Sequence, residues 1–286
     1  MRAAFFLIQG AAAATALELG ARLVMLSPMI DWRHWHNEPW LVGGLVVLGW
    51  LWAIAAGPLR GRLSPGTAYP RSHALRFYLG LISFYLAVGS PLDQVAERFL
   101  FSAHMLQHQI LIFPAAILLL QGTPAWMIDP LLQPRWVRIP ARFLTHPLIS
   151  GITYTLVISL WHAPGLYDWA LQDRLVHIVE HLMFFSAAVL YWWPVLSPSV
   201  VLPRRPHGVQ MLYLLAVIIA MTPLFAFITF SHDVLYPTYE FAPRLFPTFT
   251  AMHDQVLAGV MMKLVGLFGG MVAFGFAFAG WYRRNR

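Results

Sequence analysis

Residues 98–121 have the sequence RFLFSAHMLQHQILIFPAAILLLQ, which is apolar over most of its length and carries two histidines near its start. A transmembrane helix needs about 20 predominantly apolar residues, and this segment is long enough to cross a bilayer. Ionisable side chains are costly inside a membrane, so those that occur there usually serve a function. The stretch therefore predicts a membrane-spanning helix with a polar site near one end.

The same apolar character extends through the whole chain of 286 residues. It is 59% hydrophobic and 11% charged, and its mean hydropathy is +0.63. Soluble domains carry about 25% charged residues, so the composition argues against a water-soluble enzyme and against a disordered protein. The chain has no cysteine, which excludes disulfides, thiolate metal sites and cysteine catalysis. A bound metal must therefore be held by His, Met, carboxylate or backbone groups.

Eight apolar segments are predicted to span the membrane, separated by stretches rich in Pro, Gly, Arg or Asp that mark helix ends. They are residues 3–28, 40–57, 75–90, 98–121, 147–163, 174–196, 209–230 and 252–282. The predicted fold class is all-α, a polytopic integral membrane helical bundle of about seven or eight transmembrane helices. Residues 1–39 form an N-terminal helix and outer loop, and residues 40–286 form a seven-span domain.

The first span has two interpretations. Glu18 and Arg22 lie one helical turn apart and can pair on a face directed into the bundle. Alternatively, Arg2 and the apolar run after it form a signal sequence. No small-x-small cleavage site precedes a polar stretch, which favours a retained helix.

The arginines are distributed unequally between the two sets of loops. Thirteen lie at the termini or in one set of loops, and four lie in the opposite set: Arg33, Arg98, Arg174 and Arg244. Positive residues accumulate on the cytoplasmic side of membrane proteins, so eight spans place both termini in the cytoplasm. The net charge of +7 is thereby explained by topology in a lipid bilayer, and nucleic-acid binding is not expected.

Two predicted spans each contain an H-x-x-x-H pair, His104 with His108 and His177 with His181. Residues four apart lie on one face of a helix, and both pairs fall at a similar depth below the non-cytoplasmic end. Neutral imidazole is a common metal ligand, so the four histidines predict a metal or haem site. A polar network that only positions the helices is the alternative.

Other residues on the same side of the membrane are candidates for the site. His162 and His253 lie at helix ends, where each is a possible metal ligand or an interfacial residue. Asp93 is expected either to orient an imidazole or to cap the following helix. His34 and His36 form an H-x-H in the first outer loop. The further supporting candidates are Met105, Glu180, Met252, Asp254 and Lys263. Lys263, the only lysine, falls within a span and needs a partner, for which Glu180 is nearest in predicted depth.

Several short motifs together resemble the multi-spanning cytochrome c oxidase assembly factors of the CtaG type. They are FSAHMLQH at 101–108, WHAPGLYD at 161–168, HIVEH at 177–181, WWP at 192–194 and DQ at 254–255. The resemblance runs from about residue 40 to 282. It implies a bacterial inner-membrane protein that helps to mature haem–copper oxidases at their copper centres. By position, it assigns the site to His104, His108, His162, His177, His181, His253 and Asp254. The first helix and Lys263 depart from the family pattern.

The leading functional hypothesis is an assembly factor that handles copper and delivers it to an oxidase subunit or a copper chaperone, rather than an enzyme. The chain is also a possible homo-oligomer. Imidazoles with a nearby thioether suit copper in a chain without thiolates. One alternative is a zinc peptidase, because His177, Glu180 and His181 match the H-x-x-E-H motif. Another is a bis-His haem protein that uses one histidine from each facing helix.

Overall fold

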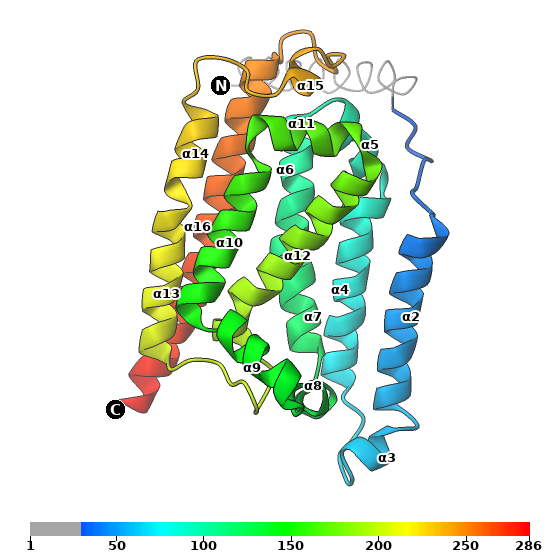
Figure 1. The fold of residues 1–286 in the computed structure, drawn as a ribbon, viewed down its shortest axis with the longest axis vertical. Coiled ribbons are helices and arrows are strands. Elements are labelled where there is room, and N and C mark those ends of the chain that lie inside the picture. Colours follow the sequence, from blue (N-terminus) through cyan, green and yellow to red (C-terminus); the bar gives the residue numbers. More distant parts are fainter. Residues whose placement is uncertain (1–29) are drawn as a thin grey trace, which may run out of the picture.

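Long apolar helices form a bundle in the computed structural model, which describes residues 30–286 (Figure 1). Within residues 30–286, five helical segments are long and apolar enough to cross a membrane: α2 (Pro39–Ala56), α6–η1–α7 (Phe101–Gly122), α12 (Arg174–Leu196), α13–α14 (His207–Thr229) and α16 (Ala251–Arg284). Two bent pairs raise the number to seven if each is one span. They are α4 (Arg71–Gly89) with α5 (Pro91–Arg98), at 41°, and α9 (Arg135–Leu144) with α10 (Pro147–Trp161), at 71°. The described part of the chain contains no strand.

The predicted helical membrane bundle is confirmed, and each of the seven predicted spans between residues 40 and 282 coincides with one of these segments. The predicted span 3–28, with the signal-sequence alternative, lies outside the described residues. Large apolar side chains on the outer faces of the helices are exposed, for example Leu156, Phe268 and Phe276. An apolar surface of this extent needs an apolar environment, which a bilayer provides.

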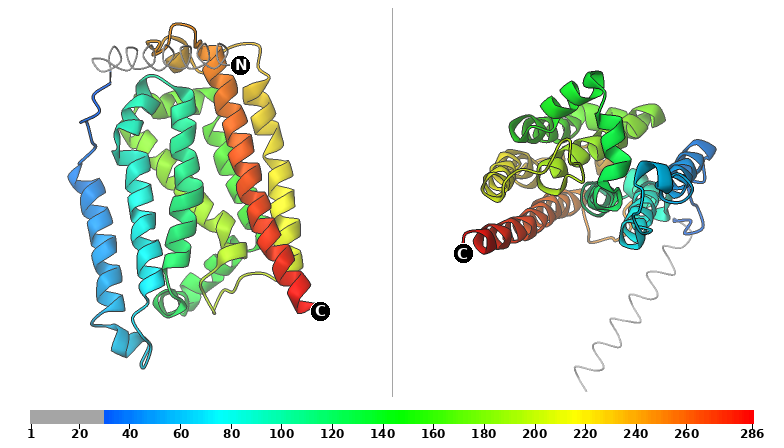
Figure 2. Two further views of the ribbon diagram at one scale, coloured as in Figure 1. Left: turned by 180° about the vertical axis from the view of Figure 1, so that it is seen from behind. Right: turned by 90° about the horizontal axis from the view of Figure 1, so that it is seen from below.

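Short helices cover the two ends of the bundle. α11 (Pro164–Gln172) and α15 (Pro237–Glu240) lie with α5 at one end, called here the α11 end. α3 (Arg60–Leu63), α8 (Ala125–Leu132) and α9 lie at the other, the α9 end (Figure 1). Figure 2 shows α16 running the length of the bundle, where it packs against α13, α14 and α6. α4 packs on α7, and α12 packs against α7, α10 and α11.

Helix starts at the α11 end are fixed by local sequence. Pro91, Pro164 and Pro237 occupy the first helical turn, where the missing N–H of proline costs nothing. The Asp173 carboxylate accepts hydrogen bonds from the backbone N–H groups of Leu175 and Val176, at 2.8 and 3.1 Å, and so caps α12. The Asp173 cap thus sets where α12, the helix that carries His177 and His181, begins.

The span formed by α6 and α7 is interrupted by a short π-helix, η1 (Leu111–Ala115), which contains Pro114. Proline cannot donate a backbone hydrogen bond, and its ring clashes with the carbonyl four residues earlier, so the helix widens there. Within this turn the carbonyl of Ile112 accepts a hydrogen bond from the indole of Trp192 at 2.8 Å. The bond joins α6–η1–α7 to α12, the two elements that carry the paired histidines.

Candidate metal centre

The structure brings one face of α6 and one face of α12 together at a buried polar cluster. His104 and His108 come from α6, and Glu180 and His181 come from α12. One potential ligand atom from each of these four residues lies within 4.8 Å of all the others. All four side chains are buried, so their polar atoms are removed from water. These four residues are called the central cluster.

Hydrogen bonds from outside the central cluster determine which nitrogen of His104 carries hydrogen. His104 Nδ1 lies 3.0 Å from the hydroxyl of Tyr239, and this hydroxyl donates its only hydrogen to the carbonyl of Ala96 at 2.7 Å. His104 must therefore donate from Nδ1, which leaves a lone pair on Nε2. That lone pair faces Nε2 of His108 at 3.0 Å. Either His108 donates across this contact, or both lone pairs face one cation.

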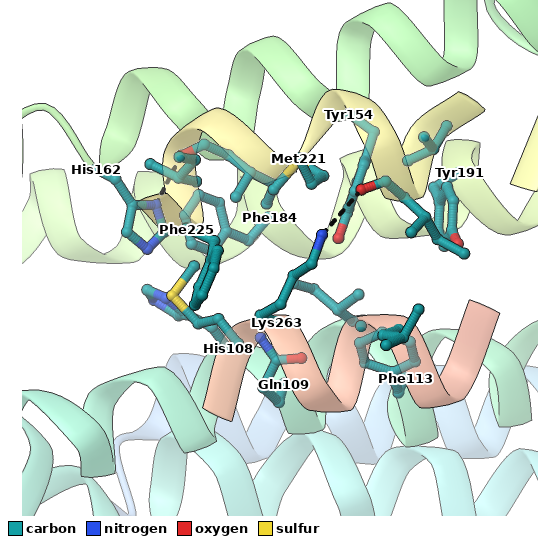
Figure 3. A pocket seen from close by; sticks show the side chains of 18 residues that line it. His108, Gln109, Phe113, Tyr154, His162, Phe184, Tyr191, Met221, Phe225 and Lys263 are labelled. Atoms are coloured by element: carbon teal, nitrogen blue, oxygen red, sulfur yellow. Dashed lines mark hydrogen bonds between the residues drawn. The ribbon is translucent and has the colours of Figure 1, made fainter. Parts of the chain in front are cut away.

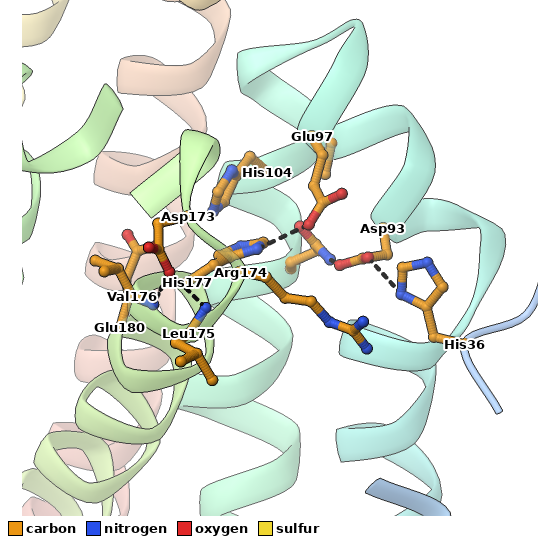
Figure 4. A network of polar contacts seen from close by, with 12 residues as sticks. His36, Asp93, Glu97, His104, Asp173, Arg174, Leu175, Val176, His177 and Glu180 are labelled. Atoms are coloured by element: carbon orange, nitrogen blue, oxygen red, sulfur yellow. Dashed lines mark hydrogen bonds and ion pairs between the residues drawn. The ribbon is translucent and has the colours of Figure 1, made fainter. Parts of the chain in front are cut away.

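His177 is oriented in the same way, by a carboxylate (Figure 4). Its Nδ1 lies 2.8 Å from Oε1 of Glu97, and its Nε2 is buried without a hydrogen-bond partner in the described part of the chain. The His177 ring lies beside those of His181 and His104, with centroid separations of 4.3 and 5.3 Å. A carboxylate that holds one imidazole nitrogen while the other is left free is a common arrangement around protein-bound metals.

Glu180 is the most unusual member of the central cluster. Its side chain is fully buried, and among residues 30–286 neither carboxylate oxygen accepts a hydrogen bond. The nearest basic nitrogen is His108 Nε2, at 3.8 Å. An unpaired carboxylate in a protein interior costs several kcal/mol, so this position calls for a proton or a cation. The side chains present therefore fit a metal ion, because they offer one negative charge and several imidazole nitrogens.

Asp93 lies outside the central cluster and joins three segments near it. Asp93 lies within α5, which is capped by Ser90, whose side chain accepts from the backbone N–H of Leu92. The following helix, α6, is capped by Asp254 and not by Asp93. The Asp93 carboxylate accepts a 2.6 Å hydrogen bond from the Gln107 amide and contacts His36 Nδ1 at 2.8 Å. Asp93 thus orients an imidazole, but it is that of His36 in the loop before α2.

The contact with Asp93 raises the pKa of His36 above its ordinary value of 6.5, because the carboxylate stabilises the imidazolium more than partial burial opposes it. The stabilisation is complete below about pH 6.5 and is lost as the pH rises through the higher folded-state pKa. His36→Gln should therefore lower the unfolding temperature more at about pH 6 than at about pH 9. Thermal unfolding of the detergent-solubilised chain measures this. His34→Gln is the control, and an equal loss at both pH values would contradict the prediction.

The last helix contributes Asp254 but not His253. The Asp254 carboxylate accepts hydrogen bonds from the backbone N–H groups of Phe101 and Ser102, at 2.6 and 3.0 Å, and so caps α6 from a neighbouring helix. His253 is exposed and forms a capping box with Thr250 at the start of α16. The structure therefore places His253 at the helix end as a capping residue, outside the central cluster. Met252 beside it is partly buried.

The predicted pairing of Lys263 with Glu180 is wrong. Lys263 Nζ donates to the hydroxyl of Thr222, on α14, at 2.7 Å. It also lies 3.4 Å from the carbonyl of Ile218, on α13 (Figure 3). The ammonium group therefore contacts α13 and α14, whereas the Glu180 carboxylate lies in the central cluster with histidines of α6 and α12. Lys263 lines a cavity that also reaches His108 and His162.

His162 lies at the end of α10 and beside the central cluster. Its ring is buried, stacks on Phe184 with an interplanar angle of 9° and lies 6.0 Å from the ring of His108. Its Nε2 contacts the sulfur of Met105, one of the supporting candidates, at 3.2 Å. The structure thus brings five of the six predicted histidines close together. His162 comes from the end of α10, whereas the other four come from α6 and α12.

A groove of about 900 Å³ connects the surface at the α11 end with the histidines. Residues of the loop before α2, of α5 and of α12 line it; they include His34, His36, Glu38, Asp93, Glu97, His177 and His181. His181 belongs to both the groove and the central cluster. The groove therefore gives the buried cluster a route to the exterior.

Two residues that position the imidazoles were missed from sequence. Glu97 lies one helical turn after Asp93, and this spacing places both carboxylates on one face of α5. Tyr239 belongs to the short helix α15, more than 130 residues after its partner His104. No local sequence signal connects a loop tyrosine with a histidine so far away.

The geometry gives no support to the peptidase and haem alternatives. In an H-x-x-E-H peptidase both histidines bind zinc and the glutamate acts as a base, whereas here Glu180 belongs to the central cluster and His177 does not. A bis-His haem needs a planar space between the two helices. The rings of His104 and His108 instead lie within 5.7 Å of the His181 ring, and Phe184 packs on His108.

Comparison with known proteins gives one family match. The family model described as cytochrome c oxidase caa3 assembly factor (CtaG) matches residues 50–284, which includes every member of the central cluster. No curated protein and no solved structure matches the chain. The match confirms the family to which the sequence motifs pointed.

Proposed function

Because the chain belongs to the cytochrome c oxidase caa3 assembly factor family, we propose that it binds copper in the central cluster as cargo for an oxidase copper centre. The observation that carries this proposal is the fully buried Glu180, whose carboxylate has no hydrogen-bond partner among the described residues and faces three imidazoles. A divalent cation there would satisfy the carboxylate and the lone pairs together. Without a cation or a proton, the negatively charged Glu180 carboxylate would stay buried with no hydrogen bond among the described residues.

The donor set favours copper or zinc. Imidazole suits both, and copper(II) is bound more tightly than the other divalent first-row ions by most N/O sites. Ligand atoms around a tetrahedral ion with bonds of about 2.0–2.1 Å lie roughly 3.4 Å apart. The separations of up to 4.8 Å in the central cluster therefore require a modest contraction around the ion. Zinc is the competing cargo, and the binding experiment below includes it.

Delivery requires that the ion can enter and leave. The groove at the α11 end provides the route, because His177 and His181 line it together with the carboxylates of Asp93 and Glu97, whereas Glu38 in the same groove is paired with Arg174. We place this end on the outer side of a bacterial inner membrane, with the arginine-rich loops in the cytoplasm. The proposed partner at the groove is an oxidase subunit or a copper chaperone.

The test of this function is metal binding by the purified full chain. Elemental analysis and competitive titration should find about one copper ion bound in the central cluster of each chain, and His181→Ala should lose it. His232→Ala, at an exposed histidine, is the matched control. The proposal is refuted if the purified protein stays metal-free and its His181→Ala variant still supports oxidase maturation in cells.

Tyr239→Phe removes the acceptor that orients His104. Loss of such an outer partner lowers metal affinity by about 10–100-fold, because the imidazole is no longer held with its lone pair toward the ion. Competitive copper titration measures the change. Tyr213→Phe is the control, since it also loses a buried hydroxyl hydrogen bond, to the carbonyl of Tyr191, but lies away from the histidines. Equal affinities for the two variants would contradict the orienting role.

A further inference from the structure

Met105 and His162 form a contact that the central cluster does not explain. The thioether sulfur of Met105, on α6, lies 3.2 Å from Nε2 of His162, at the end of α10. The two residues are 0% and 1% exposed, so water does not separate them from their surroundings. Both atoms are therefore held against each other in a closed part of the bundle.

The hydrogen-bond partner of His162 determines which ring nitrogen carries the hydrogen and which carries a free lone pair. His162 Nδ1 lies 2.7 Å from the carbonyl oxygen of Ile158, and a carbonyl oxygen can only accept. The hydrogen of the neutral ring is therefore on Nδ1, and Nε2 directs a lone pair at a sulfur that has no hydrogen to donate. No carboxylate in residues 30–286 forms an ion pair with His162, so a doubly protonated ring would be an uncompensated buried charge.

We propose that Nε2 of His162 and Sδ of Met105 are two ligands of a soft monovalent cation, copper(I), at a site separate from the central cluster. Thioether and imidazole together favour copper(I), whereas a carboxylate with imidazoles favours a harder divalent ion. Around a tetrahedral ion, bonds of about 2.0 Å to nitrogen and 2.3 Å to sulfur place the two ligand atoms about 3.5 Å apart, so the pair must open slightly from 3.2 Å to hold the ion. The cation also removes the repulsion between two lone pairs.

The two sites are neighbours. The ring of His162 lies 6.0 Å from that of His108, a member of the central cluster, and Phe184 packs on both rings. The inference rests on the proposed function only in taking copper as the cargo. It adds that the chain distinguishes a soft monovalent ion from a harder divalent ion by holding each with a different donor set.

Silver(I) is a redox-inert probe of the soft site, and zinc(II) is a probe of the central cluster. In competitive titrations of the full chain in detergent, Met105→Leu should weaken silver(I) binding by at least about 10-fold and leave zinc(II) binding unchanged. Glu180→Gln should weaken zinc(II) binding and leave silver(I) binding unchanged. Met127→Leu is the matched control, because Met127 is a partly buried methionine on α8, at the α9 end, and should leave both affinities unchanged.

Leucine has nearly the volume of methionine, so Met105→Leu should fold, and its unfolding temperature without metal checks this. X-ray absorption of the silver(I)-loaded wild-type chain gives a readout that needs no variant, because a sulfur ligand must appear in its first shell. Wild-type silver(I) affinity in Met105→Leu, or a first shell without sulfur, overturns the inference and leaves the pair as a packing contact. Silver(I) binding without any zinc(II) or copper(II) binding instead supports the soft site and refutes the central cluster as a metal site.

Discussion

Glu180→Gln is expected to abolish binding of a divalent ion in the central cluster and, at the same time, to raise the thermal stability of the metal-free chain. Losing an outer partner of a metal ligand costs about 10–100-fold in affinity, and losing the only carboxylate of the cluster should cost more. The gain in stability has a separate cause. Glutamine has the shape of glutamate without its charge, so the variant no longer buries an unpaired carboxylate.

Two measurements check this pair of effects: competitive copper(II) and zinc(II) titration, and the unfolding temperature with and without metal. A ligand that binds only the folded state stabilises it, so the wild type should gain stability on metal addition and Glu180→Gln should not. Glu240→Gln is the control, because Glu240 is an exposed glutamate at the same end. Loss of stability in metal-free Glu180→Gln, together with unchanged metal affinity, would show that Glu180 only supports the packing.

The second large effect is expected from Gly122→Ala. An added Cβ at Gly122, the last residue of α7, would lie 2.4 Å from the backbone nitrogen and 2.5 Å from the Cα of Phe77 on α4. Because these are backbone atoms, no side-chain rotation relieves the clash, and α4 and α7 must separate. The same shift strains the 3.1 Å hydrogen bond from the indole of Trp52 to the carbonyl of Gly122. Overpacking of this kind costs about 3 kcal/mol or more.

Thermal unfolding in detergent measures this cost as a lower midpoint temperature. Gly43→Ala, within α2, is the matched control, because an added Cβ there meets nothing within 4 Å. Alanine is the better helix former by roughly 0.5–1 kcal/mol, so the control should be unchanged or slightly stabilised. Equal midpoints for the two variants would show that α4 and α7 do not pack as closely as the structure has them.

Periodicity and helix-end signals were sufficient for the architecture between residues 40 and 282. Each long apolar run became a helix in one of the expected positions, since backbone groups in a bilayer must be satisfied within the helix itself. The i, i+4 spacing also placed His104 with His108, and His177 with His181, on single faces. Those predictions depend only on the local rise and twist of a helix.

Two departures from expectation have a common origin. His253 and Lys263 were assigned to the site from their depth along α16, but depth does not say which way a helix face turns. Rotation about the helix axis is determined by packing against neighbours, and α16 turns Lys263 toward α13 and α14. Sequence position therefore gave the level of these residues and not their partners.

Amino-acid order alone is enough to show that this chain is a helical membrane protein without thiolate chemistry, with paired histidines at one level. Hydrophobic length, helical spacing and composition are local properties, and they suffice for that conclusion. The packing of the helices had to be known to see that Glu180 joins His104, His108 and His181. The same holds for the orientation of imidazoles by Tyr239 and Glu97 and for the contact of Met105 with His162. These contacts join helices far apart in the chain, and their geometry depends on how side chains from all of them fill one core.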